Sequence, residues 1–171
     1  MDFKDLEVKI KQPYPEIIGA QDDAQTVAIL KNLAFSRVGE LSGVLNYIYQ
    51  SVVADKTHEE IAQIFEEIGV VEMLHQDMLM YAIRDFGGNP KYEDSQGNFF
   101  NTVNLNYSMK LRDMLENNIR AESIAIENYN MAINRVKNQS LKDLFARIIE
   151  DEKRHLEIFK RIRDTVEFMS V

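Results

Sequence analysis

Apolar residues recur at the three- and four-residue spacing of a helix face over four long stretches of the chain. The stretches begin near residues 22, 57, 106 and 140, and the first three end near residues 54, 86 and 137. Two short connections flank one long connection in the middle. This pattern predicts an all-α, antiparallel four-helix bundle of the ferritin-like type, with a long crossover between helices two and three.

Residues with strong turn or capping preferences mark the ends of these helices. Thr57, with Glu60 three positions later, predicts a capping box at the start of the second helix. The Gly-Gly-Asn-Pro run at 87–90 ends that helix. Residues 88–105 are polar and rich in turn formers, so we expect them to form the crossover. The pair Asn138 and Gln139 makes the turn before the last helix.

The first 20 residues do not share the helical pattern. Apolar residues alternate with polar ones there, and prolines then interrupt the alternation: Leu6, Val8, Ile10, Pro13 and Pro15. This predicts an extended N-terminal arm with weak strand character, able to pack on a neighbouring subunit. We therefore divide the chain into an arm, residues 1–20, and a four-helix bundle, residues 21–171.

Charged residues interrupt the apolar faces at matching positions in the two halves of the helical region. Each half places one glutamate in its first helix and a Glu-x-x-His sequence in its second helix. The repeat predicts two copies of one helical hairpin that face each other across a pseudo-two-fold axis. The repeated residues are Glu40, Glu72 and His75 in the first half, and Glu122, Glu152 and His155 in the second.

These six residues predict a dinuclear metal site. Residues three apart on a helix lie on one face, so a glutamate and a histidine at that spacing can reach the same point. Four ionised carboxylates buried together would protonate unless cations neutralised them. Oxygen and nitrogen donors without thiolate suit manganese or iron, and zinc also fits. We expect two manganese or iron ions per subunit, with the glutamates also moving protons: ligands Glu40, Glu72, His75, Glu122, Glu152 and His155.

Three further residues are candidates for contacts around these ligands. Asp151 can accept the free ring N–H of His75 and so fix its orientation, the alternative being a solvated helix carboxylate. Tyr47 follows Glu40 by two helical turns, and Tyr129 follows Glu122 by the same distance. They can hydrogen-bond into the site, but we favour plain core packing for both.

Composition narrows the functional classes. The chain has no cysteine, which excludes disulfides, thiolate catalysis, iron–sulfur clusters and cysteine-bound zinc or iron. A net charge of −8 without a basic run argues against nucleic-acid binding. There is no apolar run of membrane-spanning length, and the N-terminus lacks the pattern of a secretory signal. We therefore expect a cytoplasmic protein without a membrane partner.

Around the six candidate ligands, the sequence resembles the ferritin-like superfamily over roughly residues 21–170. It is most similar to the manganese catalases and small proteins like them, through residues 39–41, residues 71–75, the Gly-Gly-x-Pro stop and the final Glu-Asp-Glu-x-x-His. Bacterioferritins share the six ligands, and their haem-binding methionine corresponds to Met73. A haem ligand is conceivable there, but we favour a plain methionine on the helix flank and expect no haem. Rubrerythrins usually carry a further glutamate at the position of Ala125 and a cysteine-containing tail, so the likeness to them is weaker.

The resemblance implies an oxidoreductase with a dinuclear centre that acts on hydrogen peroxide or dioxygen. A catalase would need no external reductant, whereas a peroxidase would need an electron-donor protein. The alternative is a bacterioferritin-like ferroxidase that binds and stores iron. A metal-stabilised scaffold without activity is a third reading. In each case we expect a homo-oligomer, a dimer or larger.

Overall fold

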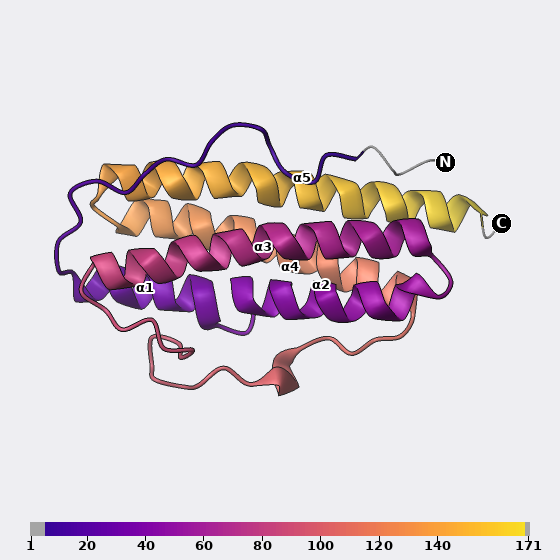
Figure 1. Cartoon of the computed structure of the whole chain (residues 1–171), viewed down its shortest axis with the longest axis horizontal. Helices are drawn as coiled ribbons and strands as arrows, with labels where there is room; N and C mark the ends of the chain where they lie inside the picture. Colours follow the sequence, from indigo (N-terminus) through magenta and orange to yellow (C-terminus); the bar gives the residue numbers. More distant parts are fainter. Residues whose placement is uncertain (1–5, 170–171) are drawn as a thin grey trace.

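The computed structural model describes residues 6–169 and has the predicted all-α architecture. Helices α1 and α2 follow each other along one rod, and α3 runs back beside them (Figure 1). A long connection then passes along the outside of the bundle to the antiparallel pair α4 and α5 (Figure 1). The elements are α1 Ala24–Phe35, α2 Glu40–Asp55, α3 Glu59–Asp85, the 3-10 helix η1 Thr102–Asn104, α4 Leu111–Arg135 and α5 Gln139–Met169.

The first predicted helix is broken, so the prediction of one continuous helix over residues 22–54 is wrong. Helix α1 ends at Phe35, and Ser36 and Gly39 on either side of the break have extended backbones. Gly39 packs so closely on α1 that a Cβ atom would overlap the carbonyl oxygen of Leu33. The break makes Glu40 the first residue of α2, where the helix dipole favours a carboxylate.

The ends of the other helices agree with the sequence in part. The capping box is absent, because α3 starts at Glu59 and the Thr57 hydroxyl points back to the carbonyl of Ala54 at 3.5 Å. The predicted stop is confirmed, since α3 ends at Asp85 and Gly87 has φ of +83°. Helix α4 begins five residues later than expected, at Leu111.

Two hydrophobic clusters fill the bundle, one on each side of its middle. The cluster at one end joins α1 to the end of α3 and the start of α5, with Phe145 and Leu79 fully buried. The other cluster joins α2 to the start of α3 and the end of α5, with Phe65 and Phe159 fully buried. Between residues 6 and 169, no helix is both long and apolar enough to cross a membrane.

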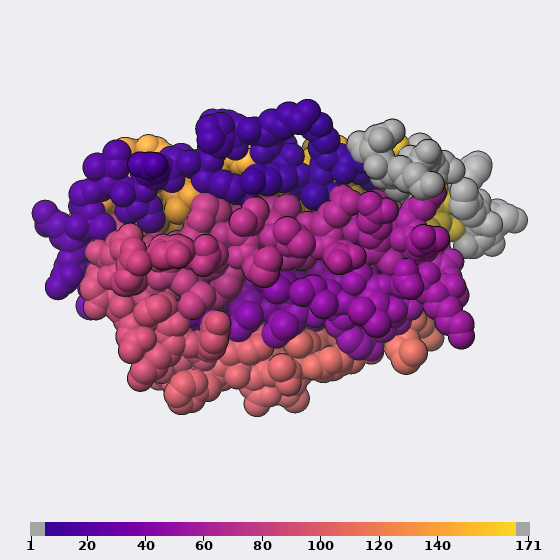
Figure 2. All heavy atoms as spheres, in the orientation of Figure 1, coloured from indigo at the N-terminus to yellow at the C-terminus, as the bar shows by residue number. Residues whose placement is uncertain are grey.

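The N-terminal arm packs on α5 of its own chain, while packing on a neighbouring subunit stays a prediction. It is extended over residues 6–20 but forms no strand there, so the expectation of strand character is wrong. Figures 1 and 2 show the indigo arm running along α5. Side chains of α5 hold it: Ser140 accepts a hydrogen bond from the Ile18 backbone at 2.8 Å, and Arg147 donates to the Gln12 carbonyl at 2.8 Å.

Candidate metal centre

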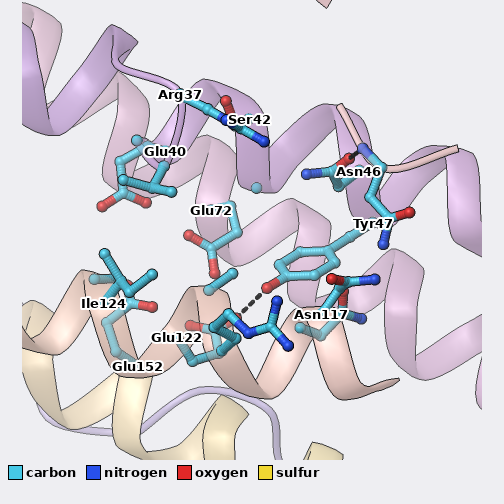
Figure 3. Close-up of a pocket in the computed structure, with 18 of the residues that line it drawn as sticks. Arg37, Glu40, Ser42, Asn46, Tyr47, Glu72, Asn117, Glu122, Ile124 and Glu152 are labelled. Carbon is cyan, nitrogen blue, oxygen red and sulfur yellow. Dashed lines mark hydrogen bonds between the residues drawn. The ribbon is translucent and has the colours of Figure 1, made fainter. Parts of the chain in front are cut away.

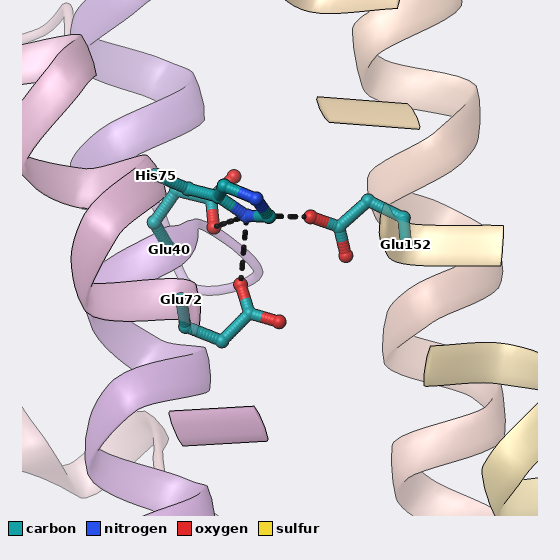
Figure 4. Close-up of side chains that lie close together, drawn as sticks. All are labelled: Glu40, Glu72, His75 and Glu152. Carbon is teal, nitrogen blue, oxygen red and sulfur yellow. Dashed lines mark ion pairs between the residues drawn. The ribbon is translucent and has the colours of Figure 1, made fainter. Parts of the chain in front are cut away.

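The six candidate ligands converge between the two hydrophobic clusters. They come from α2, α3, α4 and α5, and each is at most 5% exposed. Figure 4 shows Glu40, Glu72 and His75 facing Glu152 across the bundle. The donor atoms form two groups, each spanning at most 4.8 Å: Glu40, Glu72, His75 and Glu152 in one, and Glu72, Glu122, Glu152 and His155 in the other.

Two glutamates belong to both groups and offer one oxygen to each histidine. Nδ1 of His75 lies 3.6 Å from Oε2 of Glu72 and 3.0 Å from Oε1 of Glu152. Nδ1 of His155 lies 3.0 Å from Oε1 of Glu72 and 3.8 Å from Oε2 of Glu152. This is the arrangement in which two carboxylates could bridge a pair of cations.

Each of the remaining glutamates approaches one histidine only. Oε2 of Glu40 is 3.5 Å from Nδ1 of His75. Oε2 of Glu122 is 3.9 Å from Nδ1 of His155. The two halves of the centre therefore keep the pseudo-two-fold relation of the sequence repeat, with one terminal glutamate and one imidazole each.

Several of the innermost polar atoms lack hydrogen bonds although water cannot reach them. They are Oε1 of Glu72, Oε1 of Glu152, and Nδ1 of both His75 and His155. Buried polar atoms in proteins normally have hydrogen-bond partners. Here the atoms face one shared space and approach only one another, His75 and His155 each having Nδ1 at 3.0 Å from a carboxylate oxygen. A pair of cations therefore fits the donor set.

Without cations, protons must balance the charge of this cluster. Burial raises the pKa of Glu40 and of Glu122 well above the usual value, and the carboxylates beside them add to the effect. Burial opposes charging of the histidines, but the surrounding carboxylates outweigh it. They raise the pKa of His155 to about 9 and that of His75 well above its usual value.

The shared glutamates behave in the opposite way. Burial opposes their charged form, yet contacts with the histidines bring the pKa of Glu72 and of Glu152 below the usual value. The shifts work together: Glu40 and Glu122 hold protons more firmly, whereas Glu72 and Glu152 keep their charge beside histidines that favour the protonated form. Both changes bring the cluster closer to charge balance in the absence of metal.

The predicted residues around the ligands all contact the cluster. The Tyr47 hydroxyl donates to Glu122 and the Tyr129 hydroxyl donates to Glu40, so each tyrosine serves the glutamate of the other half. Both rings also pack on core phenylalanines, so hydrogen bonding accompanies the core packing that the sequence favoured. Asp151 is fully buried with Oδ2 at 3.3 Å from Nε2 of His75, which excludes a solvated carboxylate.

Two residues near the centre were missed from the sequence. The Tyr14 hydroxyl, from the arm, donates to Oδ2 of Asp151 at 2.6 Å and lies 3.2 Å from Nε2 of His75. Nη1 of Arg147 lies 2.8 Å from the same Asp151 oxygen. The four-residue spacing of Arg147 and Asp151 is a signal that could have revealed that pair. No local pattern indicates where Tyr14 lies.

A pocket of about 390 Å³ opens between α2 and α4 and reaches the centre. Figure 3 shows Glu40, Glu72, Glu122 and Glu152 at its base and Arg37 toward its rim. Small residues keep the approach open, since a Cβ atom at Gly43 would lie 3.3 Å from Cγ of Glu72. The pocket therefore brings a small molecule to the edge of the carboxylate cluster, although each of the four glutamates is almost completely buried.

The chain is similar to several solved metalloprotein structures. It matches KatB, a manganese catalase from Anabaena PCC7120, with a TM-score of 0.83 and 22% identity over 92% of this chain and 80% of that chain. It matches the bacterioferritin of Desulfovibrio desulfuricans with a TM-score of 0.71 and 24% identity over 84% of this chain and 81% of that chain. It matches the bacterioferritin of Rhodobacter capsulatus with a TM-score of 0.73 and 20% identity, over 86% of this chain and 88% of that chain. At such identities the likeness establishes a ferritin-like fold.

No curated protein sequence matches this chain significantly. The sequence model of one family does match, over residues 31–163, which include all six converging residues. This is the Rubrerythrin model. From the sequence, the likeness to rubrerythrins is weaker than that to the manganese catalases, because Ala125 stands where rubrerythrins usually have a glutamate, yet the match covers most of the bundle. The chain therefore belongs to the Rubrerythrin family.

Proposed function

We propose that this protein binds two manganese or iron ions between its helices and acts on hydrogen peroxide as a catalase or peroxidase. The observation that carries the proposal is the pair of shared glutamates. Glu72 and Glu152 each direct one oxygen to each half of a buried, otherwise unpartnered donor set. Glu40 with His75, and Glu122 with His155, complete the two halves. This set matches the ligand pattern of carboxylate-bridged dinuclear proteins in helix bundles.

The donor set also bears on which ions fit. Carboxylate and imidazole donors suit manganese and iron, and the protein has no cysteine to favour softer ions. When bound, such a pair supplies the two-electron redox change that peroxide chemistry requires. The chain's own residues would hold the ions in position, transfer protons and confine the substrate in a pocket.

Proton transfer falls to the carboxylates at the base of the pocket. Peroxide loses two protons when it is oxidised to dioxygen and takes up two when it is reduced to water, and Glu40 and Glu122 line the pocket where these protons must move. Each is hydrogen-bonded by a buried tyrosine, which holds a proton at that oxygen. The pocket admits a molecule of the size of hydrogen peroxide to this carboxylate layer.

The catalase and peroxidase versions differ in the source of electrons. In a catalase, one peroxide is oxidised to dioxygen while a second is reduced to water, so no donor is needed. In a peroxidase, two electrons and two protons reduce one peroxide to two waters. The electrons must come from a donor protein, because cysteine-based relay centres are absent from this chain. The fold likeness to a manganese catalase supports the first version.

Metal analysis combined with a peroxide assay tests the proposal. The protein purified from its native host should contain about two manganese or iron ions per chain. The metal-loaded protein should consume hydrogen peroxide, evolving oxygen without a reductant if it is a catalase. Glu72→Gln should abolish both metal retention and turnover, whereas Glu66→Gln, an exposed residue of the same helix, should change neither. Two bound ions without peroxide consumption, with or without a reductant, would refute the proposed activity.

Iron storage is the second candidate, because the fold is also similar to that of two bacterioferritins. Apolar side chains are exposed along the outer face of α2 and α3, as expected of a surface that packs between subunits: Ile48, Val52, Val70 and Met73. A homo-oligomer is therefore part of our proposal. Size-exclusion chromatography separates the two functions, because storage needs a large hollow assembly and a ferroxidase that retains iron, whereas a catalase needs neither.

A further inference from the structure

The N-terminal arm covers a buried polar network that lies behind only one of the two histidines. Figure 1 shows the arm passing along α5, the helix that contributes Asp151 and Arg147. Asp151 and His75 are fully buried, and Arg147 is 3% exposed. The arm itself thus reaches the surroundings of the candidate metal centre.

Asp151 is the central residue of this network. Its Oδ2 accepts the hydrogen bond from the Tyr14 hydroxyl at 2.6 Å and lies 3.3 Å from Nε2 of His75. Its Oδ1 accepts a hydrogen bond from the backbone N–H of Ile10 at 2.8 Å. Two of the partners of Asp151 therefore belong to the arm.

Arg147 ties the same network to the arm backbone. Its Nη1 lies 2.8 Å from Oδ2 of Asp151, and its Nη2 and Nε donate to the carbonyls of Ile10 at 2.6 Å and Gln12 at 2.8 Å. The guanidinium also lies over the ring of Tyr14, 4.5 Å from its centroid. Displacing the arm would remove two partners of Asp151 and leave Arg147 only its contact with Asp151 among these contacts.

The other histidine has no such support. Nε2 of His155 is buried and makes no hydrogen bond. In the sequence repeat, the residue before Glu152 is Asp151, but the residue before Glu72 is Val71. The carboxylate that faces His75 therefore has no counterpart facing His155.

We propose that the arm, through Tyr14, is a positioning element for the metal at His75, and that the two halves of the centre bind metal with unequal affinity. This rests on the proposed dinuclear site. With Nδ1 directed to the carboxylates, Nε2–H of His75 donates to Asp151, which fixes the ring and makes Nδ1 a stronger donor. Tyr14 and Arg147 hold Asp151 in place. The half with His75 is thus the tighter site and fills first.

Titration of the metal-free, full-length protein with Mn²⁺ tests this inference. We expect two binding steps, the first at least about tenfold tighter, which is the usual effect of such a supporting carboxylate. Mn²⁺ electron paramagnetic resonance should show an isolated ion at one equivalent and a coupled pair at two. His155→Gln should retain the tight step, whereas His75→Gln should retain only the weak one.

Tyr14→Phe is the decisive variant because it removes one hydroxyl and keeps the ring. It should weaken the first step roughly tenfold and leave the second within about twofold. Tyr81→Phe, an exposed tyrosine of α3, is the matched control and should alter neither step. Equal affinities in the parent protein, or an unchanged first step in Tyr14→Phe, would overturn the inference while leaving a dinuclear site intact. Failure of the parent to bind Mn²⁺ would instead count against the proposed function.

Discussion

Loading the metal-free protein with two Mn²⁺ ions at pH 7 should release about four protons. The reason is the charge balance of the buried cluster. Burial raises the pKa of Glu40 and of Glu122 well above the usual value, so we expect both carboxyl groups to carry protons before metal binds. The raised pKa values of His75 and His155 keep both rings protonated as well.

The same groups must all lose their protons to act as ligands. Four carboxylates and two neutral imidazoles facing two divalent ions again sum to zero charge, so metal replaces protons without a net change. The overall affinity for the pair should therefore rise steeply with pH, by as much as about four powers of ten per unit near neutrality. The dependence should become shallower above pH 9, where His155 has already lost its proton in the metal-free protein.

Calorimetry measures this proton count directly. Mn²⁺ is titrated into the metal-free protein at pH 7 in buffers with different heats of ionisation, and the slope of the observed heat against that quantity gives the protons released. Glu40→Gln removes one of the titrating groups and should lower the count by about one. A release of one proton or fewer by the parent protein would refute the charge balance described for the cluster.

Three further predictions follow from the same geometry. The metal-free protein should lose stability between pH 6 and pH 9. Folding raises the pKa of His155 from about 6.5 to about 9, so protonated His155 stabilises the fold fully below pH 6.5 and this contribution is lost as the pH rises through about 9. Urea titrations should show a loss of up to about 3 kcal/mol from this group, and the metal-loaded protein should not show it. Ala125→Leu should narrow the pocket between α2 and α4 and lower kcat/KM for peroxide by roughly tenfold or more with the metal content unchanged. Unimpaired turnover would exclude this route. Phe65→Ala should destabilise the protein by about 3–5 kcal/mol in chemical denaturation, because the ring is fully buried.

The helices and the converging residues could be predicted from sequence because both signals are local and repeated. A glutamate or histidine on an apolar helix face is visible as an exception to the helical period, and the second half of the chain repeats the exceptions of the first. The break before Glu40 was not predictable in this way. It depends on the close approach of Gly39 to the Leu33 carbonyl, which is a contact in space that leaves the apolar spacing unchanged.

The contacts of Tyr47, Tyr129 and Tyr14 illustrate a second limit. The sequence placed the first two tyrosines near the glutamates of their own helices, but each donates to the glutamate of the opposite half, since α2 and α4 face each other across the centre. Tyr14 lies in an extended segment without periodicity, so no register fixes its side chain against α5. Only the folded arm brings its hydroxyl to Asp151.

The repeat and the residues that break it have different consequences for the proposed chemistry. The repeated residues build a nearly symmetric donor set, which is what two like ions require. The unrepeated ones make the surroundings unequal: the arm and Asp151 close the side behind His75, while Gly43 and the pocket between α2 and α4 leave the opposite side open. The pocket thus gives a small substrate an approach across the carboxylates of Glu40 and Glu122. In the proposed function, the symmetric donor set holds the two metals. The unequal surroundings give the substrate a defined direction of approach to them.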